Sequence, residues 1–67
     1  MSEFTVNKQP RPWHEGLSVA ALLAELGHAP DTVATALNGA FVPRGHREAA
    51  LIRPGDALTL IQPITGG

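Results

Sequence analysis

The chain contains no cysteine. Disulfide bonds, thiolate metal sites and cysteine nucleophiles are therefore all excluded. A secreted domain this small would ordinarily need disulfides to compensate for its small core. The first residues, Met1-Ser2-Glu3-Phe4, also lack the basic start and apolar run of a signal peptide. We therefore expect an intracellular protein of the reducing cytoplasm.

The sequence has no surplus of positive charge and no long apolar run. Five basic and six acidic residues give a formal net charge of −1, and Lys8 is the sole lysine. Nucleic-acid-binding surfaces need basic side chains gathered on one face. A membrane-spanning helix needs about 20 consecutive apolar residues. Neither nucleic acid nor membrane is therefore an expected partner.

Motifs that would carry catalysis are missing as well. There is no glycine-rich nucleotide-binding loop of the Rossmann or Walker type, so ATP is not expected to bind this chain itself. His14, His28 and His46 are too scattered to form a metal site. Ser18 has no paired histidine or acid that would make it a nucleophile. We predict that the protein is not an enzyme and binds no cofactor.

What is present is a normal apolar content of 43% in 67 residues, which predicts one small packed domain.

The most secure element is a helix of about two turns. Val19, Leu22, Leu23 and Leu26 recur at helical spacing on one stripe. Ser18 precedes them as an N-cap, and the helix is expected to stop at a glycine directly after the stripe.

Strands are predicted on both sides of this helix. Phe4 and Val6 alternate with polar residues, and a turn over residues 7–10 leads to an edge strand over residues 11–14, which contains a proline. After the helix, a strand over residues 32–37 meets Asn38-Gly39, a strong signal for a two-residue hairpin turn. The chain returns over residues 40–42. A loop with one helical turn follows over residues 44–50, and residues 51 and 52 are expected to pack beneath it.

A turn at residues 53–56, with glycine at the position that favours type II, leads into the last strand over residues 57–62. In this strand Leu58 and Leu60 face one way, and Thr59 and Ile61 face the other. The predicted order is β-β-α-β-β-β. This order predicts an α+β fold in which a mixed sheet of four to five strands wraps one helix. The last strand is expected to lie centrally, beside the first.

The chain stops at Gly66-Gly67. Two glycines without Cβ atoms can pass through a channel that any side chain would block. The terminal carboxylate is ionised at neutral pH, so it can attack the α-phosphorus of ATP held by an activating enzyme. Read alone, the dipeptide fits a frayed or truncated end equally well. We predict a domain over residues 1–63 and a flexible tail over residues 64–67.

Several motifs in order resemble the ubiquitin-like β-grasp sulfur carriers, and most closely the ThiS family of thiamin biosynthesis. The resemblance covers essentially the whole chain, and departures at Arg53-Pro54 and Trp13 leave the tail untouched. The motifs are Ser18-Val19-Ala20-Ala21-Leu22-Leu23, Ala36-Leu37-Asn38-Gly39 followed by Val42-Pro43-Arg44, Pro54-Gly55-Asp56, and Gln62-Pro63-Ile64-Thr65-Gly66-Gly67.

This resemblance implies a specific chemistry. An ATP-dependent adenylating enzyme, similar to the E1 enzymes of ubiquitin systems, would activate the Gly67 carboxylate. A sulfur donor enzyme would convert the adenylate to a thiocarboxylate at Gly67. Thiazole synthase would then accept the sulfur. Gly66 would give clearance beside the reactive end, and Thr65 and Ile64 would line the entry to the partner channels.

The remaining candidates lie on the globule. Ile61 and Thr59, on the sheet face away from the helix, are expected to form an apolar docking surface for the partners, and Phe41 is a further candidate. A chain this small favours the alternative that Phe41 is core. Trp13 is expected to act as a lid on the core. Arg44, Arg47 and Arg53 would either cluster near the tail to attract an acidic partner or remain scattered in solvent.

Other functions stay open. Within the same fold, the carrier would serve molybdopterin or cysteine synthesis. Molybdopterin carriers tend to be longer, with paired phenylalanine and proline before the tail, whereas Ile61-Gln62-Pro63 stands here. A different class is a ubiquitin-like modifier that conjugates to lysines of target proteins. A binding module with an inert tail is the fourth interpretation.

Overall fold

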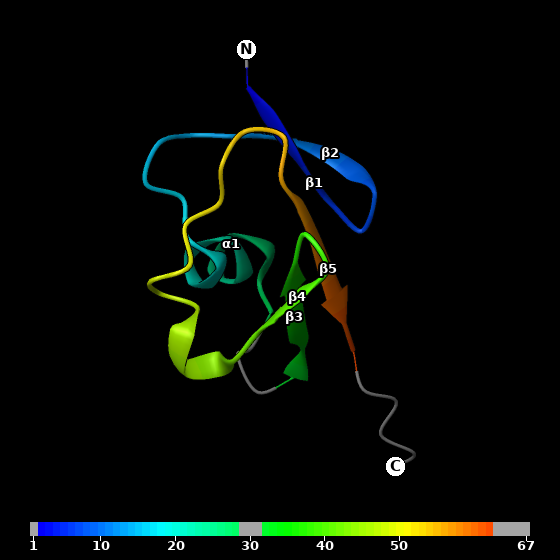
Figure 1. The fold of residues 1–67 in the computed structure, drawn as a ribbon, viewed down its shortest axis with the longest axis vertical. Coiled ribbons are helices and arrows are strands. Elements are labelled where there is room, and N and C mark those ends of the chain that lie inside the picture. Colours follow the sequence, from blue (N-terminus) through cyan, green and yellow to red (C-terminus); the bar gives the residue numbers. More distant parts are fainter. Residues whose placement is uncertain (1, 29–31, 63–67) are drawn as a thin grey trace.

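Five strands form one mixed sheet, and a two-turn helix lies against one of its faces (Figure 1). The structure is a computed structural model, and it describes residues 2–28 and 32–62. The strands lie in the order β2-β1-β5-β3-β4, with β1 and β5 parallel and the other neighbours antiparallel. The elements are β1 (Glu3–Val6), β2 (Gln9–Pro12), α1 (Val19–Leu26), β3 (Ala34–Leu37), β4 (Ala40–Val42), the 3₁₀ turn η2 (Arg44–His46) and β5 (Ala57–Ile61).

Helix α1 has the limits that the sequence predicts. The Ser18 hydroxyl accepts a hydrogen bond from the Ala21 amide at 3.0 Å, which satisfies one of the free amides of the first turn. Gly27 adopts the left-handed conformation, with φ of 77°, and its amide donates to the Ala24 carbonyl. The chain can leave the helix there without strain because glycine has no Cβ.

The first hairpin turns earlier than predicted. Asn7 and Lys8 both have positive φ, 49° and 70°, so two residues reverse the chain and Val6 pairs with Gln9. The predicted turn over residues 7–10 was therefore two residues too long, and the strand predicted over residues 11–14 lies two residues earlier, at Gln9–Pro12. β2 is an edge strand, as predicted. Its residues Pro10 and Pro12 leave few amides for pairing with another chain.

The second hairpin is confirmed. Asn38 and Gly39 have φ of 51° and 83°, and Leu37 pairs with Ala40 across the turn. The helical turn predicted after β4 is η2. The turn before β5 is also confirmed, since the Asp56 amide donates to the Arg53 carbonyl at 3.1 Å and φ of Gly55 is 86°.

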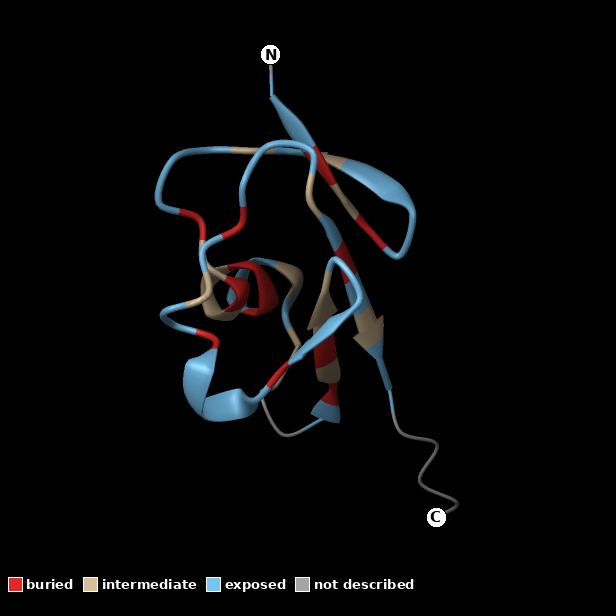
Figure 2. Cartoon of the chain, in the orientation of Figure 1, coloured by how far each residue is buried: buried red, intermediate tan, exposed pale blue. Residues whose placement is uncertain are grey.

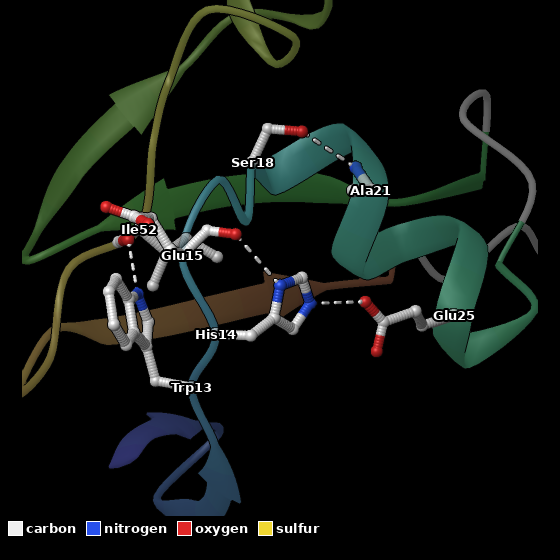
Figure 3. A network of polar contacts seen from close by, with 7 residues as sticks. All are labelled: Trp13, His14, Glu15, Ser18, Ala21, Glu25 and Ile52. Carbon is white, nitrogen blue, oxygen red and sulfur yellow. Dashed lines mark hydrogen bonds and ion pairs between the residues drawn. The ribbon is translucent and has the colours of Figure 1, made fainter. Parts of the chain in front are cut away.

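The core lies between α1 and the inner face of the sheet, where the buried segments of Figure 2 gather. Trp13 packs against this core, and its indole Nε1 donates to the Ile52 carbonyl at 2.7 Å (Figure 3). The predicted lid is therefore confirmed. Ile52 is buried as expected, but Leu51 beside it is 57% exposed. The core cluster consists of Phe4, Val6, Leu17, Val19, Leu22, Ile52 and Leu58.

Candidate functional site

The four tail residues predicted to carry the chemistry, Ile64, Thr65, Gly66 and Gly67, lie outside the described residues. So does the predicted domain boundary at residue 63. The description ends at Gln62, directly after β5. The structure therefore defines the strand that leads to the tail and the surface beside it.

Strand β5 is the central strand of the sheet, as predicted. It pairs with β3 over four residue pairs, from Leu37–Leu58 to Ala34–Ile61, and with β1 over two. Its predicted facing is confirmed. Leu58 is buried and Leu60 packs against the core, whereas Thr59 and Ile61 are exposed on the opposite face. The chain that continues to the diglycine thus starts from a strand that is hydrogen-bonded to a neighbouring strand on each side.

The start of β5 is bonded to the turn between β3 and β4. The Asn38 amide donates to the Ala57 carbonyl at 2.7 Å, and the Ala57 amide donates to Asn38 Oδ1 at 2.9 Å. Asn38 Nδ2 donates to Asp56 Oδ1 at 3.0 Å. The turn residue Asn38 therefore has a structural role that the hairpin signal alone did not predict.

A row of side chains crosses the sheet face that points away from α1. Phe41 on β4 pairs with Ala36 on β3, and Ala36 pairs with Thr59 on β5. Directly opposed residues of antiparallel strands share a face, with Cβ atoms about 4.5–5.5 Å apart. Two residue pairs further along, and therefore on the same face, Ala34 lies opposite Ile61. We call the set Phe41, Ala36, Thr59, Ala34 and Ile61 the outer-face patch.

The outer-face patch contains two of the three large hydrophobic side chains that are exposed in the described residues. Phe41 is 68% exposed and Ile61 53%. The favoured interpretation that Phe41 is core was therefore wrong. Strand parity explains the difference, because the next residue, Val42, pairs with Thr35 and both face the core. The alternative, that Phe41 joins Ile61 and Thr59 on one exposed face, is confirmed.

Neither alternative given for the three arginines, a cluster near the tail or scattered exposure to solvent, holds for Arg47. The Arg47 side chain is only 5% exposed. Its Nη2 donates to the Val33 carbonyl at 2.6 Å, and its Nε donates to Thr35 Oγ1 at 3.2 Å. Arg53 lies before the start of β5, at the opposite end of the strand from the tail. Arg47 therefore joins η2 to β3 inside the protein, a role that its polar sequence neighbours gave no reason to expect.

His14 is exposed and connects the segment after β2 to the helix (Figure 3). Its Nδ1 lies 3.2 Å from the Glu15 carbonyl oxygen, and its Nε2 lies 3.3 Å from Glu25 Oε2. The carbonyl, and secondly the carboxylate, raise the pKa of His14 above its usual range. Within residues 2–28 and 32–62, no three potential metal-ligating side chains come together.

One hollow, of about 430 Å³, lies between α1 and η2, on the helix side of the sheet. Leu23, Ala24, Arg44 and Glu48 are among its lining residues. No serine, threonine or lysine is among the described residues that line it. No helix in the part of the chain that the structure describes is long and apolar enough to cross a membrane.

The strand order β2-β1-β5-β3-β4 over one helix, with a diglycine following the central strand, defines a protein of the ubiquitin-like β-grasp class. The ThiS family model matches residues 3–67. The chain therefore belongs to the ThiS family. This match includes the terminal glycines, which lie outside the described residues.

Solved structures agree with this assignment. The chain is similar to the crystal structure of a thiamine biosynthesis protein (ThiS) from Geobacter metallireducens, with 31% identity and a TM-score of 0.81, over 97% of this chain and 99% of that chain. An NMR solution structure of a thiamine biosynthesis protein from the same organism gives 32% identity and a TM-score of 0.78, over 97% and 87% of the two chains. A search of curated proteins finds no match.

Proposed function

We propose that this chain is the sulfur carrier of thiamine biosynthesis and that its Gly67 carboxylate is the group that carries the sulfur. The observation that supports this most is that the ThiS family model extends through residue 67 and so includes Gly66 and Gly67. The two similar structures are both thiamine biosynthesis proteins. The chain acts as a co-substrate of partner enzymes, not as an enzyme itself.

The chemistry follows from the properties of a carboxylate. A carboxylate oxygen is a poor leaving group, so an adenylating enzyme first joins it to the α-phosphorus of ATP and releases pyrophosphate. Sulfide sulfur from a donor enzyme then attacks the acyl carbon, and AMP leaves. The product is a thiocarboxylate at Gly67, which passes its sulfur to thiazole synthase. ATP is bound by the partner, in keeping with the absence of a nucleotide-binding motif from this chain.

The outer-face patch is the surface on which we expect the adenylating enzyme to dock. Phe41 and Ile61 are large, apolar and exposed, and the alanines of β3 between β4 and β5 leave room for a partner side chain. Aromatic side chains at the centre of an interface commonly contribute more than 1 kcal/mol to binding. The patch includes the last residue of β5, so docking there brings the tail toward the enzyme.

Intact-protein mass spectrometry tests the chemistry. The chain is incubated with the adenylating enzyme of its source organism, ATP and a sulfide donor. We expect a mass increase that corresponds to replacing one oxygen by sulfur, mapped to Gly67 and absent from a chain that lacks Gly67. An unchanged mass with a competent enzyme would contradict the proposal. An isopeptide bond from Gly67 to target lysines would instead indicate a protein modifier.

Kinetics with the same enzyme tests the docking surface. Phe41→Ala is expected to raise the KM for the carrier by about tenfold, because it removes a desolvated aromatic contact. Leu51→Ala is the matched control. Leu51 is equally apolar and 57% exposed, but it lies beside Ser18 at the start of α1, outside the outer-face patch. Equal effects of the two substitutions would refute docking on this face.

A further inference from the structure

The pairing of β1 with β5 ends before β5 does. β1 contributes two residue pairs, Thr5–Ala57 and Val6–Leu58, and then the chain turns away at Asn7 and Lys8. β5 continues to Ile61. On the β1 side, the last part of β5 therefore has no neighbouring strand within the described residues.

The side chain of Asn7 takes the place of the missing strand. The Asn7 amide donates to the Leu58 carbonyl at 2.9 Å, which is the normal bond of a parallel ladder. The next bond of such a ladder would run from the Leu60 amide to the main-chain oxygen of Asn7. Here the Leu60 amide donates to Asn7 Oδ1 at 2.8 Å. Asn7 is in the left-handed region, with φ of 49°, so its side-chain amide continues the ladder where its backbone does not.

We infer that Asn7 is a positioning residue for delivery of the carrier terminus: its bond to Leu60 fixes the end of β5, from which the reactive tail extends. This inference rests on the proposed function. Leu60 lies two residues before Gln62, and Gly67 follows five residues after Gln62 in the sequence. Five residues span at most about 18 Å. The place and direction of the strand end therefore limit where Gly67 can reach.

Asn7 is outside the outer-face patch. Removing its side chain should therefore affect delivery of Gly67, which kcat reports, and leave docking, which KM reports, almost unaffected. A carrier without the Asn7–Leu60 bond still presents Phe41 and Thr59 to the enzyme, and only Ile61 of the patch moves with the end of β5. Its KM should therefore change by no more than about twofold. In a fraction of the docked complexes, however, the end of β5 leaves its native place and Gly67 misses the nucleotide. The rate at saturating carrier, kcat, should fall. A residue that only stabilised the fold would change neither parameter at a temperature where the protein remains folded.

The chain offers a matched set of variants. Asn7→Gly removes the side-chain acceptor and suits the positive φ of this position. Asn7→Asp keeps an acceptor oxygen and also tolerates the left-handed region. Lys8→Gly relaxes the other residue of the same turn, whose φ is 70°, without touching the bond to Leu60. Amide hydrogen exchange at Leu60 and at Leu58 reports whether the bond is lost and whether the sheet stays intact.

We expect Asn7→Gly to increase exchange at Leu60, leave Leu58 protected, and lower kcat by about three- to tenfold, the equivalent of one hydrogen bond. KM should remain within about twofold of the original. Asn7→Asp and Lys8→Gly should retain the original kcat. A normal kcat for Asn7→Gly, or an equal loss of kcat in Lys8→Gly, overturns the inference about Asn7. Neither result contradicts the sulfur-carrier function. If the unaltered chain is not activated, the sulfur-carrier function fails and the inference fails with it.

Discussion

Asn7 and Asn38 bond to opposite edges of β5, one near each end of the strand. Asn7 follows β1 and accepts from the Leu60 amide, and Asn38 follows β3 and accepts from the Ala57 amide. Both residues begin two-residue turns and have nearly equal positive φ, 49° and 51°. In each case the side-chain amide extends pairing beyond the point where the backbone turns away. Two turns thus support the central strand that precedes the tail.

The first hairpin turn contains a residue whose replacement should stabilise the protein. Lys8 has φ of 70°, a conformation that costs a residue with a Cβ roughly 1 kcal/mol. Lys8→Gly should therefore increase the free energy of unfolding by about 0.5–1 kcal/mol. Urea denaturation measures the free energy of unfolding of each variant. Lys8→Ala keeps the backbone strain and should be no more stable than the unaltered chain. A loss of stability in Lys8→Gly would contradict the explanation.

The buried Arg47 should be among the most sensitive positions. Arg47→Ala removes the donors to the Val33 carbonyl and to Thr35 Oγ1 and leaves a buried carbonyl without this partner. We expect the free energy of unfolding to fall by about 2–4 kcal/mol in urea denaturation. Arg53→Ala, at an exposed position, should change it by less than about 0.5 kcal/mol. Similar effects at both positions would argue against the internal role of Arg47.

The two phenylalanines should differ in how much each contributes to stability. Phe4 is 2% exposed in the core, so Phe4→Ala should lower the free energy of unfolding by about 3–5 kcal/mol. Phe41→Ala should cost less than about 1 kcal/mol, because most of that ring is already in water. Thermal unfolding of both variants checks this. A large loss of stability in Phe41→Ala would contradict the exposed position of this ring. It would mean that Phe41 supports the fold rather than docking.

His14 should make stability depend on pH near neutrality. Both of its ring nitrogens face acceptors, the Glu15 carbonyl and Glu25 Oε2, and only the protonated ring can donate to both. Its pKa in the folded protein is therefore raised above the usual value of about 6.5. The stabilisation is fully present below that value and is lost as the pH rises through the folded-state pKa.

NMR titration of His14 measures this effect directly. The pKa of His14 should exceed about 6.5 in the unaltered chain and move back toward that value in Glu25→Gln. The carbonyl of Glu15 remains in that variant, so part of the rise should persist. A His14 that titrates at or below the ordinary value would exclude the predicted pair of bonds.

Much of the fold could be predicted from the sequence because its signals are local. Ser18 and Gly27 limit α1, Asn38-Gly39 fixes the second hairpin, and alternation in β5 separates Leu58 from Thr59. Each signal acts through a few adjacent residues, whose preferences agree with the final structure. The central place of β5 was also predicted from the order of the elements. The family resemblance added the interpretation of the diglycine as a sulfur-carrying terminus.

The errors concern features that depend on contacts between distant residues. Nothing in the sequence around Arg47 shows that Val33 and Thr35 lie beside it. The exposure of Phe41 follows from its register with Ala36, which a count of scarce aromatic residues cannot provide. The first turn was predicted to be two residues too long. Lys8 takes the left-handed conformation of a two-residue turn, for which glycine at that position would have been the usual signal.

The parallel pairing of β1 with β5 also governs when the sheet can form during synthesis. Thr5 pairs with Ala57, and α1, both hairpin turns and η2 lie between them in the chain. The strand at the middle of the sheet therefore leaves the ribosome after all other described elements. Contacts of such sequence separation form slowly because a long loop must close first. Without β5, the β1–β2 pair and the β3–β4 pair have no strand to join them. The five-stranded sheet can therefore form only after translation has delivered the strand that precedes the terminus.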